Sequence, residues 1–217
     1  MTVHHLGLKP SVLNQYIAEL RGIHIQKDAM RFRRNIERIG EILGYELSKT
    51  LNYTAKTITT PLGTKEMHVP DSNLVICTIL RAGLPLHQGI LNYFDTAESA
   101  FISAYREHTT SEEEFEIVTK YLASPSIDKK VLILADPMLA TGKTLEATLA
   151  VLQERGVPEQ IHIVSVIGSE QGIAHIKNIF PENTHLWIAA VDDELNNKSY
   201  IVPGLGDAGD LAFGKKL

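Results

Sequence analysis

The chain has 217 residues, of which 44% are hydrophobic and 22% are charged. This composition predicts an ordered globular protein with one sizeable core, and we expect a single α/β domain over residues 1–217. The formal net charge of −5 argues against a general affinity for nucleic acid or for an anionic membrane, because both require a basic field. A local pocket for an anionic substrate remains compatible with this charge.

The N-terminus and the cysteine content bear on the compartment. The first ten residues, MTVHHLGLKP, lack the apolar core of a signal peptide, and no apolar run approaches the roughly 18 residues of a membrane span. The single cysteine, Cys77, lies in an apolar run, so we expect an inert buried thiol. We therefore expect a cytoplasmic protein, with no metal-binding histidine motif and with His4 and His5 in a loosely held N-terminal end.

Residues 1–70 predict two helices and a β-hairpin. The helical patterns cover residues 12–21 and 28–51, and the hairpin covers residues 53–69 with its turn at Pro61-Leu62-Gly63. The second helix is amphipathic, with an apolar stripe made of Phe32, Ile36, Ile39, Leu43 and Leu47. This stripe predicts packing either on the sheet or on a second subunit, and the pattern alone does not choose between them.

The middle of the chain, residues 71–191, alternates buried strands with helices. Near-continuous apolar runs, as required of strands covered on both faces, occupy residues 74–80, 100–105, 131–135, 161–167 and 185–191. Helical patterns follow at residues 83–93, 144–155 and 171–179. This order predicts an open, mostly parallel sheet flanked by helices on both faces. Ligands should collect at the carboxyl ends of the strands, near Arg81, Arg106 and residues 136–144.

The segment ADPMLATGKT, from Ala135 to Thr144, has the features of an anion-binding loop that opens a helix. Backbone N–H groups at a helix start lack partners within the helix, and Gly142 permits a close approach of the backbone to an anion. Thr141 and Thr144 add hydroxyl donors, while Asp136 is suited to accept hydrogen bonds from sugar hydroxyls. Phosphoribose is the simplest ligand that combines a phosphate with vicinal hydroxyls.

Two other interpretations of this segment stay open at this point. A Walker A loop ends in Gly-Lys-Thr, but it needs glycine at position 137, where this chain has Pro137 with its fixed φ and missing N–H. A plain helix start, with Thr141 as the N-cap, is the simpler alternative.

Several segments together resemble the uracil phosphoribosyltransferase family, within the type I phosphoribosyltransferases. The likeness runs over nearly the whole chain, and its segments are RFRRNIERIGEILGYELSKTL, ILRAGLPLHQGI, YRE, ADPMLATGKTL and YIVPGLGDAGDLAFG. DPMLATG resembles the phosphoribosyl loop of this family, and PGLGDAGD resembles its uracil-binding loop. The resemblance implies transfer of a phosphoribosyl group to uracil, which yields UMP and diphosphate. It also implies a C-terminal base-binding hood within the uracil-binding loop region, residues 192–217.

The resemblance also assigns site residues. It implies contacts of Arg81 and Arg106 with phosphoribosyl diphosphate, and catalytic roles for Arg81 and Asp207. Uracil would be held by Ile201, Gly206, Asp207 and Ala208, and Asp207 would also approach the phosphoribosyl substrate. The remaining phosphoribosyl diphosphate contacts would be Asp136, Pro137, Met138, Leu139, Ala140, Thr141, Gly142, Lys143 and Thr144.

The chemistry of the implied reaction agrees with these roles. Loss of diphosphate leaves an oxocarbenium-like carbon while negative charge grows on the departing group, which Arg81, Mg²⁺ and Arg106 can neutralise. A glycine-rich loop can match the acceptor–donor–acceptor edge of uracil and reject the amino group of cytosine. The chain has one acid, Asp136, where many relatives have two, so we expect Mg²⁺ to arrive bound to the diphosphate.

The chain departs from the family pattern at three positions: Lys143 replaces a common glycine, and Asp193 and Glu194 replace a common Lys-Gly pair. We expect residues 107–124, with the solvated Glu112, Glu113 and Glu114, to be a mobile flap over the reacting carbon. The family resemblance also suggests GTP as an effector and a homodimer or larger homo-oligomer. Alternatives are a transferase for another base and an RNA-binding regulator, which the acidic charge disfavours.

Overall fold

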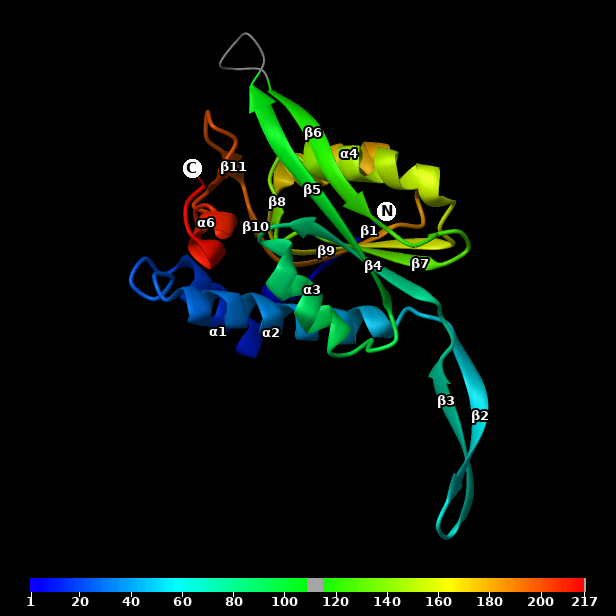
Figure 1. Cartoon of the computed structure of the whole chain (residues 1–217). Helices are drawn as coiled ribbons and strands as arrows, with labels where there is room; N and C mark the ends of the chain where they lie inside the picture. The colour runs from blue at the N-terminus through cyan, green and yellow to red at the C-terminus, as the bar shows by residue number, and fades with distance from the viewer. Residues whose placement is uncertain (109–114, 217) are drawn as a thin grey trace.

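The structure is a computed structural model that describes residues 1–108 and 115–216, with the backbone alone for 104–108 and 115–120. The described residues form an eight-stranded, mostly parallel sheet, as predicted from the buried runs (Figure 1). Neighbouring strands are parallel except for the last pair, β5 and β6. The order is β1 (Thr2–His5), β10 (His185–Asp192), β9 (Gln160–Ser169), β7 (Val131–Ala135), β4 (Leu74–Leu80), β5 (Glu98–His108) and β6 (Phe115–Ala123), while β8 (Met138–Leu139) also pairs with β9.

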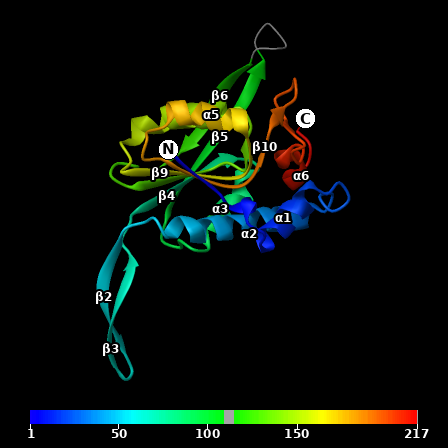
Figure 2. The same cartoon turned by 180° about the vertical axis from the view of Figure 1, so that it is seen from behind.

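Helices cover both faces of this sheet, which explains why its central strands are apolar throughout. On one face lie α1 (Val12–Arg21), α2 (Ala29–Ser48) and α3 (Gly83–Leu91), and on the other lie α4 (Lys143–Leu152) and α5 (Glu170–Ile179) (Figures 1 and 2). Two hydrophobic clusters result, one on each side of the sheet. Short 3₁₀ turns, η1 (Leu6–Leu8) and η2 (Gln153–Arg155), follow β1 and α4.

The apolar stripe of α2 packs within its own chain. Its members Phe32, Ile36, Ile39, Leu43 and Leu47 are each at most 1% exposed. Helix α3 approaches closely, since a Cβ on Gly40 would lie 2.7 Å from the carbonyl oxygen of Leu86. Of the two partners that the sequence pattern left open for this stripe, the structure therefore selects the core of the same chain.

The prediction of a loosely held N-terminus is wrong. Thr2–His5 forms the edge strand β1, which pairs in parallel with β10. The His4 ring stacks on Trp187 with 3.8 Å between the ring centroids, and its Nε2 lies 3.1 Å from Nδ1 of His185. Ring stacking and strand pairing, both made with residues about 180 positions away, hold a segment whose own sequence shows little periodicity.

Two other segments contain more regular structure than their sequences predicted. The strand expected at 100–105 extends over Glu98–His108 and pairs with β6, which was not predicted. The expected C-terminal loop contains β11 (Glu194–Leu195), β12 (Ile201–Val202) and helix α6 (Ala208–Phe213). Of the predicted flap, Glu112, Glu113 and Glu114 lie outside the described residues.

The predicted hairpin is confirmed as β2 (Tyr53–Thr60) and β3 (Gly63–Pro70), with Thr60 paired to Gly63 across the turn. It projects away from the sheet and its helices, and nearly all of its residues are exposed (Figures 1 and 2). Among the helices that the structure describes, none is long and apolar enough to cross a membrane.

Candidate functional site

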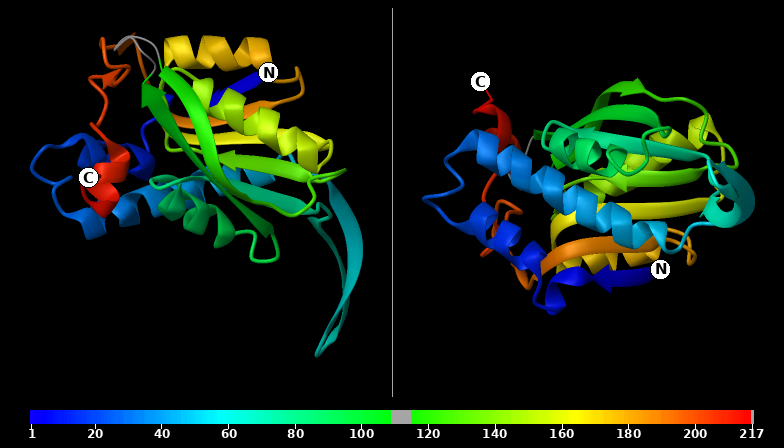
Figure 3. Two further views of the ribbon diagram at one scale, coloured as in Figure 1. Left: turned by 45° about the horizontal axis from the view of Figure 1, so that its top comes forward. Right: turned by 90° about the horizontal axis from the view of Figure 1, so that it is seen from below.

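Two segments that the sequence singled out lie beyond the carboxyl ends of the sheet strands. One is the 136–144 loop, which leads from β7 to α4. The other is the C-terminal hood, defined here as residues 201–213, which includes β12 and α6. Figure 3 shows α6 beside the connection between α1 and α2, so the hood is built against the N-terminal helices.

Strand β9 holds the 136–144 loop in place. The hydroxyl of Ser165 donates to the carbonyl oxygen of Asp136, and that of Ser169 donates to the carbonyl oxygen of Ala140, both at 2.6 Å. The Oδ1 atom of Asp136 accepts from the Met138 N–H at 3.2 Å. The loop is therefore fixed through its backbone, which leaves polar side chains facing its opening.

Gly142, rather than Thr141, is the N-cap of α4, with φ +78°. The simpler interpretation with Thr141 as the N-cap is therefore wrong by one residue; the Thr141 hydroxyl accepts instead from the Lys143 N–H at 3.4 Å. A Cβ on Gly142 would lie 2.9 Å from Cγ2 of Ile176 and 3.1 Å from the carbonyl oxygen of Gly172. Close packing of α5 and a left-handed conformation together require glycine here.

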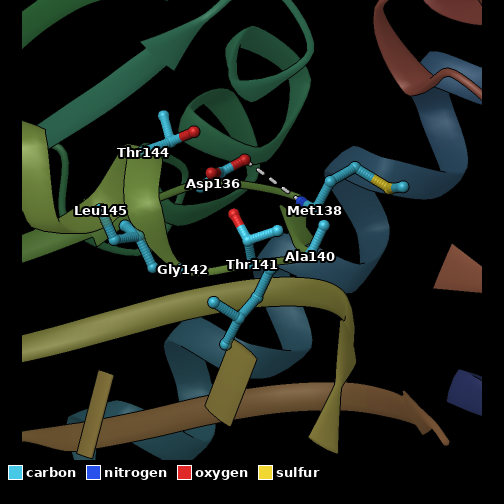
Figure 4. A pocket seen from close by; sticks show the side chains of 8 residues that line it. Asp136, Met138, Ala140, Thr141, Gly142, Thr144 and Leu145 are labelled. Carbon is cyan, nitrogen blue, oxygen red and sulfur yellow. Dashed lines mark hydrogen bonds between the residues drawn. The ribbon is translucent and has the colours of Figure 1, made fainter. Parts of the chain in front are cut away.

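The loop encloses a small pocket whose polar groups point inward (Figure 4). In that view the Thr141 hydroxyl points toward the Asp136 carboxylate. Leu139 is 1% exposed, whereas Met138 is partly buried and packs against the core. The pocket is lined by Asp136, Met138, Leu139, Ala140, Thr141, Gly142, Thr144 and Leu145.

Arg81 links the end of β4 to the hood. Its Nη2 donates to Oδ1 of Asp210 and to the carbonyl oxygen of Gly214, each at 3.1 Å. Its Nε is buried and has no hydrogen-bond partner among the described residues. The peptide bond between Leu80 and Arg81 is cis. The structure thus brings one predicted substrate arginine against the predicted uracil segment.

The hood residues that the sequence selected lie together around the start of α6. Asp207 is the N-cap, and its Oδ1 accepts from the Asp210 N–H at 2.9 Å. Gly206 has φ +91°, and the side chains of Ile201 and Ala208 are 4% and 3% exposed. Ile201 and Ala208 therefore support the segment from within, while their backbone groups and the Asp207 carboxylate supply its polar atoms.

Sequence reasoning missed the residues that fasten the hood. Arg33 Nη1 donates to the carbonyl oxygen of Ala212 at 2.6 Å, and Arg21 makes an ion pair with Asp192. Burial favours the neutral acid, but the hydrogen bonds from Arg21 and Gly204 outweigh it and lower the pKa of Asp192. One available signal was the position of Asp192 at a strand end, the same signal that pointed to Asp136. The arginines looked like ordinary charges on helices.

Three other predicted features have different outcomes. Arg106 lies in β5 opposite Ile117, but its side chain is outside the described part of the structure. Lys143 is the first residue of α4. Cys77 is fully buried, as predicted, and burial raises the pKa of its thiol to about 12, which disfavours the reactive thiolate. Among the side chains that the structure describes, no group of three or more His, Cys, Asp or Glu could hold a metal ion.

Comparisons with known proteins agree with the resemblance. The family model described as uracil phosphoribosyltransferase matches residues 9–215. A uracil phosphoribosyltransferase of Porphyromonas gingivalis is 52% identical over 217 residues, with full coverage of both chains. One from Thermococcus gammatolerans is 41% identical over 88% of this chain and 84% of its own.

A solved structure shares the whole fold. The AQ2163 protein from Aquifex aeolicus superposes with a TM-score of 0.87 at 29% identity, covering 98% of each chain. Together with the family match across both the 136–144 loop and the hood, this similarity leaves one assignment. The chain belongs to the uracil phosphoribosyltransferase family, the pentosyltransferases that convert uracil and phosphoribosyl diphosphate to UMP and diphosphate.

Proposed function

We propose that the 136–144 loop binds the ribose 5-phosphate of phosphoribosyl diphosphate and that the hood binds uracil. The observation that carries this proposal is the contact of Arg81 with Asp210. It brings the arginine expected to bind phosphoribosyl diphosphate, at the end of β4, against the hood expected to bind uracil. The backbone N–H groups of the first turn of α4 suit the phosphate. Asp136 suits the ribose hydroxyls, since its carboxylate lies in the same pocket as Thr141 and Thr144.

In this proposal, Arg81 neutralises the departing diphosphate. The bond between the anomeric carbon and the diphosphate oxygen breaks, and N1 of uracil forms the new bond to that carbon. The buried Nε of Arg81, which has no partner among the described residues, supports a role for Arg81 in binding an anion. Asp207 would accept the N1 proton, since its carboxylate lies at the start of α6, among the proposed uracil contacts. Arg106 would add charge near the diphosphate.

The donor set fits Mg²⁺ that is carried mainly by the diphosphate. Asp136 is the one carboxylate that lines the loop pocket, and the described residues hold no cluster of three acidic or imidazole ligands. Mg²⁺ commonly keeps several waters and binds through one or two carboxylates together with substrate phosphates. When bound, it would neutralise charge that grows on the diphosphate, while Asp136 would orient the ribose.

Uracil selectivity would come from backbone groups of the hood. Gly206 adopts a positive φ, which turns its two peptide groups toward different sides of the segment. Such groups can match the acceptor–donor–acceptor edge of uracil. The amino group of cytosine would face a donor and leave both unpaired.

The family also suggests GTP as an effector and assembly into a homodimer or larger homo-oligomer, and we propose both for this protein. The initial rate of UMP formation measured at increasing GTP concentrations would test the effector. The molar mass measured by light scattering after size-exclusion chromatography would test the assembly. For residues 107–124, lower protease sensitivity with phosphoribosyl diphosphate than without it would support a closing flap.

The two substrate assignments predict different kinetic defects for a substitution in the hood and a substitution in the 136–144 loop. Asp207→Ala should lower kcat by about 100-fold, because it removes the carboxylate that would accept the N1 proton. Thr141→Ala should instead raise KM for phosphoribosyl diphosphate by about tenfold, because one hydroxyl donor to a charged phosphate is lost. UMP formation with Mg²⁺ measures both variants. A normal kcat in Asp207→Ala, an unchanged KM for phosphoribosyl diphosphate in Thr141→Ala, or no UMP formation by the folded wild-type protein would contradict the proposal.

A further inference from the structure

Arg21 and Asp192 form a two-pronged ion pair behind the hood. Nη1 of Arg21 donates to Oδ2 of Asp192, and Nη2 donates to Oδ1, both at 2.7 Å. Arg21 is the last residue of α1 and Asp192 is the last residue of β10. The Asp192 side chain is 8% exposed. The pair therefore connects an N-terminal helix to a carboxyl strand end at the proposed site.

This ion pair holds Gly204 from both sides. The Gly204 N–H donates to Oδ2 of Asp192 at 2.9 Å, and its carbonyl oxygen accepts from Nη1 of Arg21 at 3.0 Å. Gly204 has φ +60°, and a Cβ on it would lie 2.1 Å from the carbonyl oxygen of Ile201. Both polar backbone groups of one glycine are thus fixed by a single pair of charged side chains.

A second contact extends this hold by one residue toward the proposed uracil contacts. Nε2 of Gln26 donates to the carbonyl oxygen of Leu205 at 3.2 Å and to that of Leu20 at 2.8 Å. Gly206 and Asp207 follow directly in the chain. The segment that precedes the proposed uracil contacts is therefore fastened to α1 and to the connection between α1 and α2.

Such a pair is better suited to positioning than to adding stability. A buried ion pair must offset the cost of removing both charges from water, so its net stabilisation is often small. A bidentate arginine–carboxylate pair does fix geometry, because two parallel hydrogen bonds define one orientation. Here Nη1 of Arg21 and Oδ2 of Asp192 each make one further hydrogen bond, to the carbonyl oxygen and to the N–H of Gly204.

We propose that Arg21 and Asp192 are positioning residues for uracil: through Gly204 they set the place of Gly206 and Asp207. This inference rests on the proposed role of the hood. Neither side chain needs to touch a substrate. Loss of the pair should let the hood shift while the 136–144 loop, held by Ser165 and Ser169 of β9, keeps its place.

Steady-state kinetics of the full chain test this inference. Asp192→Asn keeps the side-chain shape but removes the charge, and Arg21→Lys keeps the charge but removes the two-pronged geometry. Each should raise KM for uracil about tenfold, equivalent to about 1.4 kcal/mol, with KM for phosphoribosyl diphosphate changed less than about twofold. The matched control is Arg31→Lys, because the 3.4 Å ion pair of Arg31 is with Glu19 of α1 rather than with the hood, and this variant should leave both KM values unchanged.

The outcomes are separable. A rise in both KM values together, or a lower unfolding midpoint with unchanged kinetics, would overturn the positioning role. If Asp192→Asn fails to fold, Arg21→Lys decides the question by the same comparison of KM for uracil with KM for phosphoribosyl diphosphate. Asp207→Ala assayed in parallel tests the underlying assignment: a normal KM and kcat for uracil in that variant would show that the proposed role of the hood has failed. A defect in Asp207→Ala without one in Arg21→Lys or Asp192→Asn overturns the positioning inference alone.

Discussion

The 136–144 loop and the C-terminal hood both lie beyond the carboxyl ends of the sheet strands, but they are held by different parts of the chain. The loop is fixed by β9, through two serine hydroxyls that lie 29 residues along the chain from their partners. The hood is fixed by Arg21, Gln26 and Arg33, each about 180 residues away. One is part of the central sheet, whereas the other is fastened from outside by the N-terminal helices.

This difference indicates that the two halves of the site can be disturbed separately. Distortion of the loop requires movement of the buried strand β9 or of α5, whose inner face packs in the core. The hood can shift when a few polar contacts are lost, because it is held by side chains of α1, α2 and their connection and by residues at the ends of β4 and β10, rather than by pairing within the sheet. The base half of the site should therefore be the more sensitive to distant substitutions.

The largest effect is expected from Gly204→Ala. The new Cβ would lie 2.1 Å from a backbone oxygen, which cannot move without displacing the whole segment. We expect kcat/KM for uracil to fall about 100-fold, because a shift of about 1 Å at the site has that order of effect. The KM for phosphoribosyl diphosphate should stay near its wild-type value. Kinetics with each substrate varied in turn measure this, and a similar loss toward both would break the distinction between the two halves.

A smaller effect is expected from Gly142→Ala in the other half. Its Cβ would lie 2.9 Å from Cγ2 of the buried Ile176 and 3.1 Å from the carbonyl oxygen of Gly172, and alanine in a left-handed conformation costs about 1–2 kcal/mol. The KM for phosphoribosyl diphosphate should rise about tenfold, and KM for uracil should change little. Gly63→Ala is a control in the distant hairpin, where a Cβ would have nothing within 4 Å. Any kinetic change in that control would show that the defect is not local.

The smallest effect on the two halves of the site is expected from a lower pH. Protonation of His162, near the amino end of β9, should change the stability of the fold rather than either half of the site. Burial, followed by the nearby His185 and His4, lowers the pKa of His162 to about 3, while its Nδ1 accepts from Trp187 Nε1–H at 3.0 Å. Between pH 6.5 and about 3 the unfolded chain binds a proton at His162 that the folded chain excludes. Stability should therefore fall as the pH falls through this window.

Urea unfolding at pH 7 and pH 5 measures this loss. The share of His162 should be about 2 kcal/mol at pH 5, because each unit below the unfolded pKa contributes up to about 1.4 kcal/mol. His162→Asn keeps an acceptor for Trp187 but does not titrate, so its unfolding free energy should depend less on pH. The ratio of the two KM values should not change in this variant, since His162 lies near the amino end of β9 and the proposed site lies at the carboxyl ends of the strands. An equal pH-dependent loss in both proteins would contradict the role of His162.

Local patterns were sufficient for much of the fold. The apolar runs that became β4 and β7 gave the bounds of both strands, because a strand buried on both faces must be apolar along its whole length. The 136–144 loop was also readable, since its proline, glycine and hydroxyl residues are adjacent in the chain. The resemblance of PGLGDAGD then connected that loop to a base-binding segment.

What the sequence determined by itself was thus the alternation of buried strands and helices, and the two segments that carry the proposed chemistry. Only the tertiary structure decided that β1 closes one edge of the sheet, that the stripe of α2 is buried in its own chain, and that Arg21 and Asp192 hold Gly204. The physical reason is distance along the chain. Periodicity reports contacts within one element, whereas an ion pair between residues 171 positions apart leaves no spacing pattern by which either partner could be recognised.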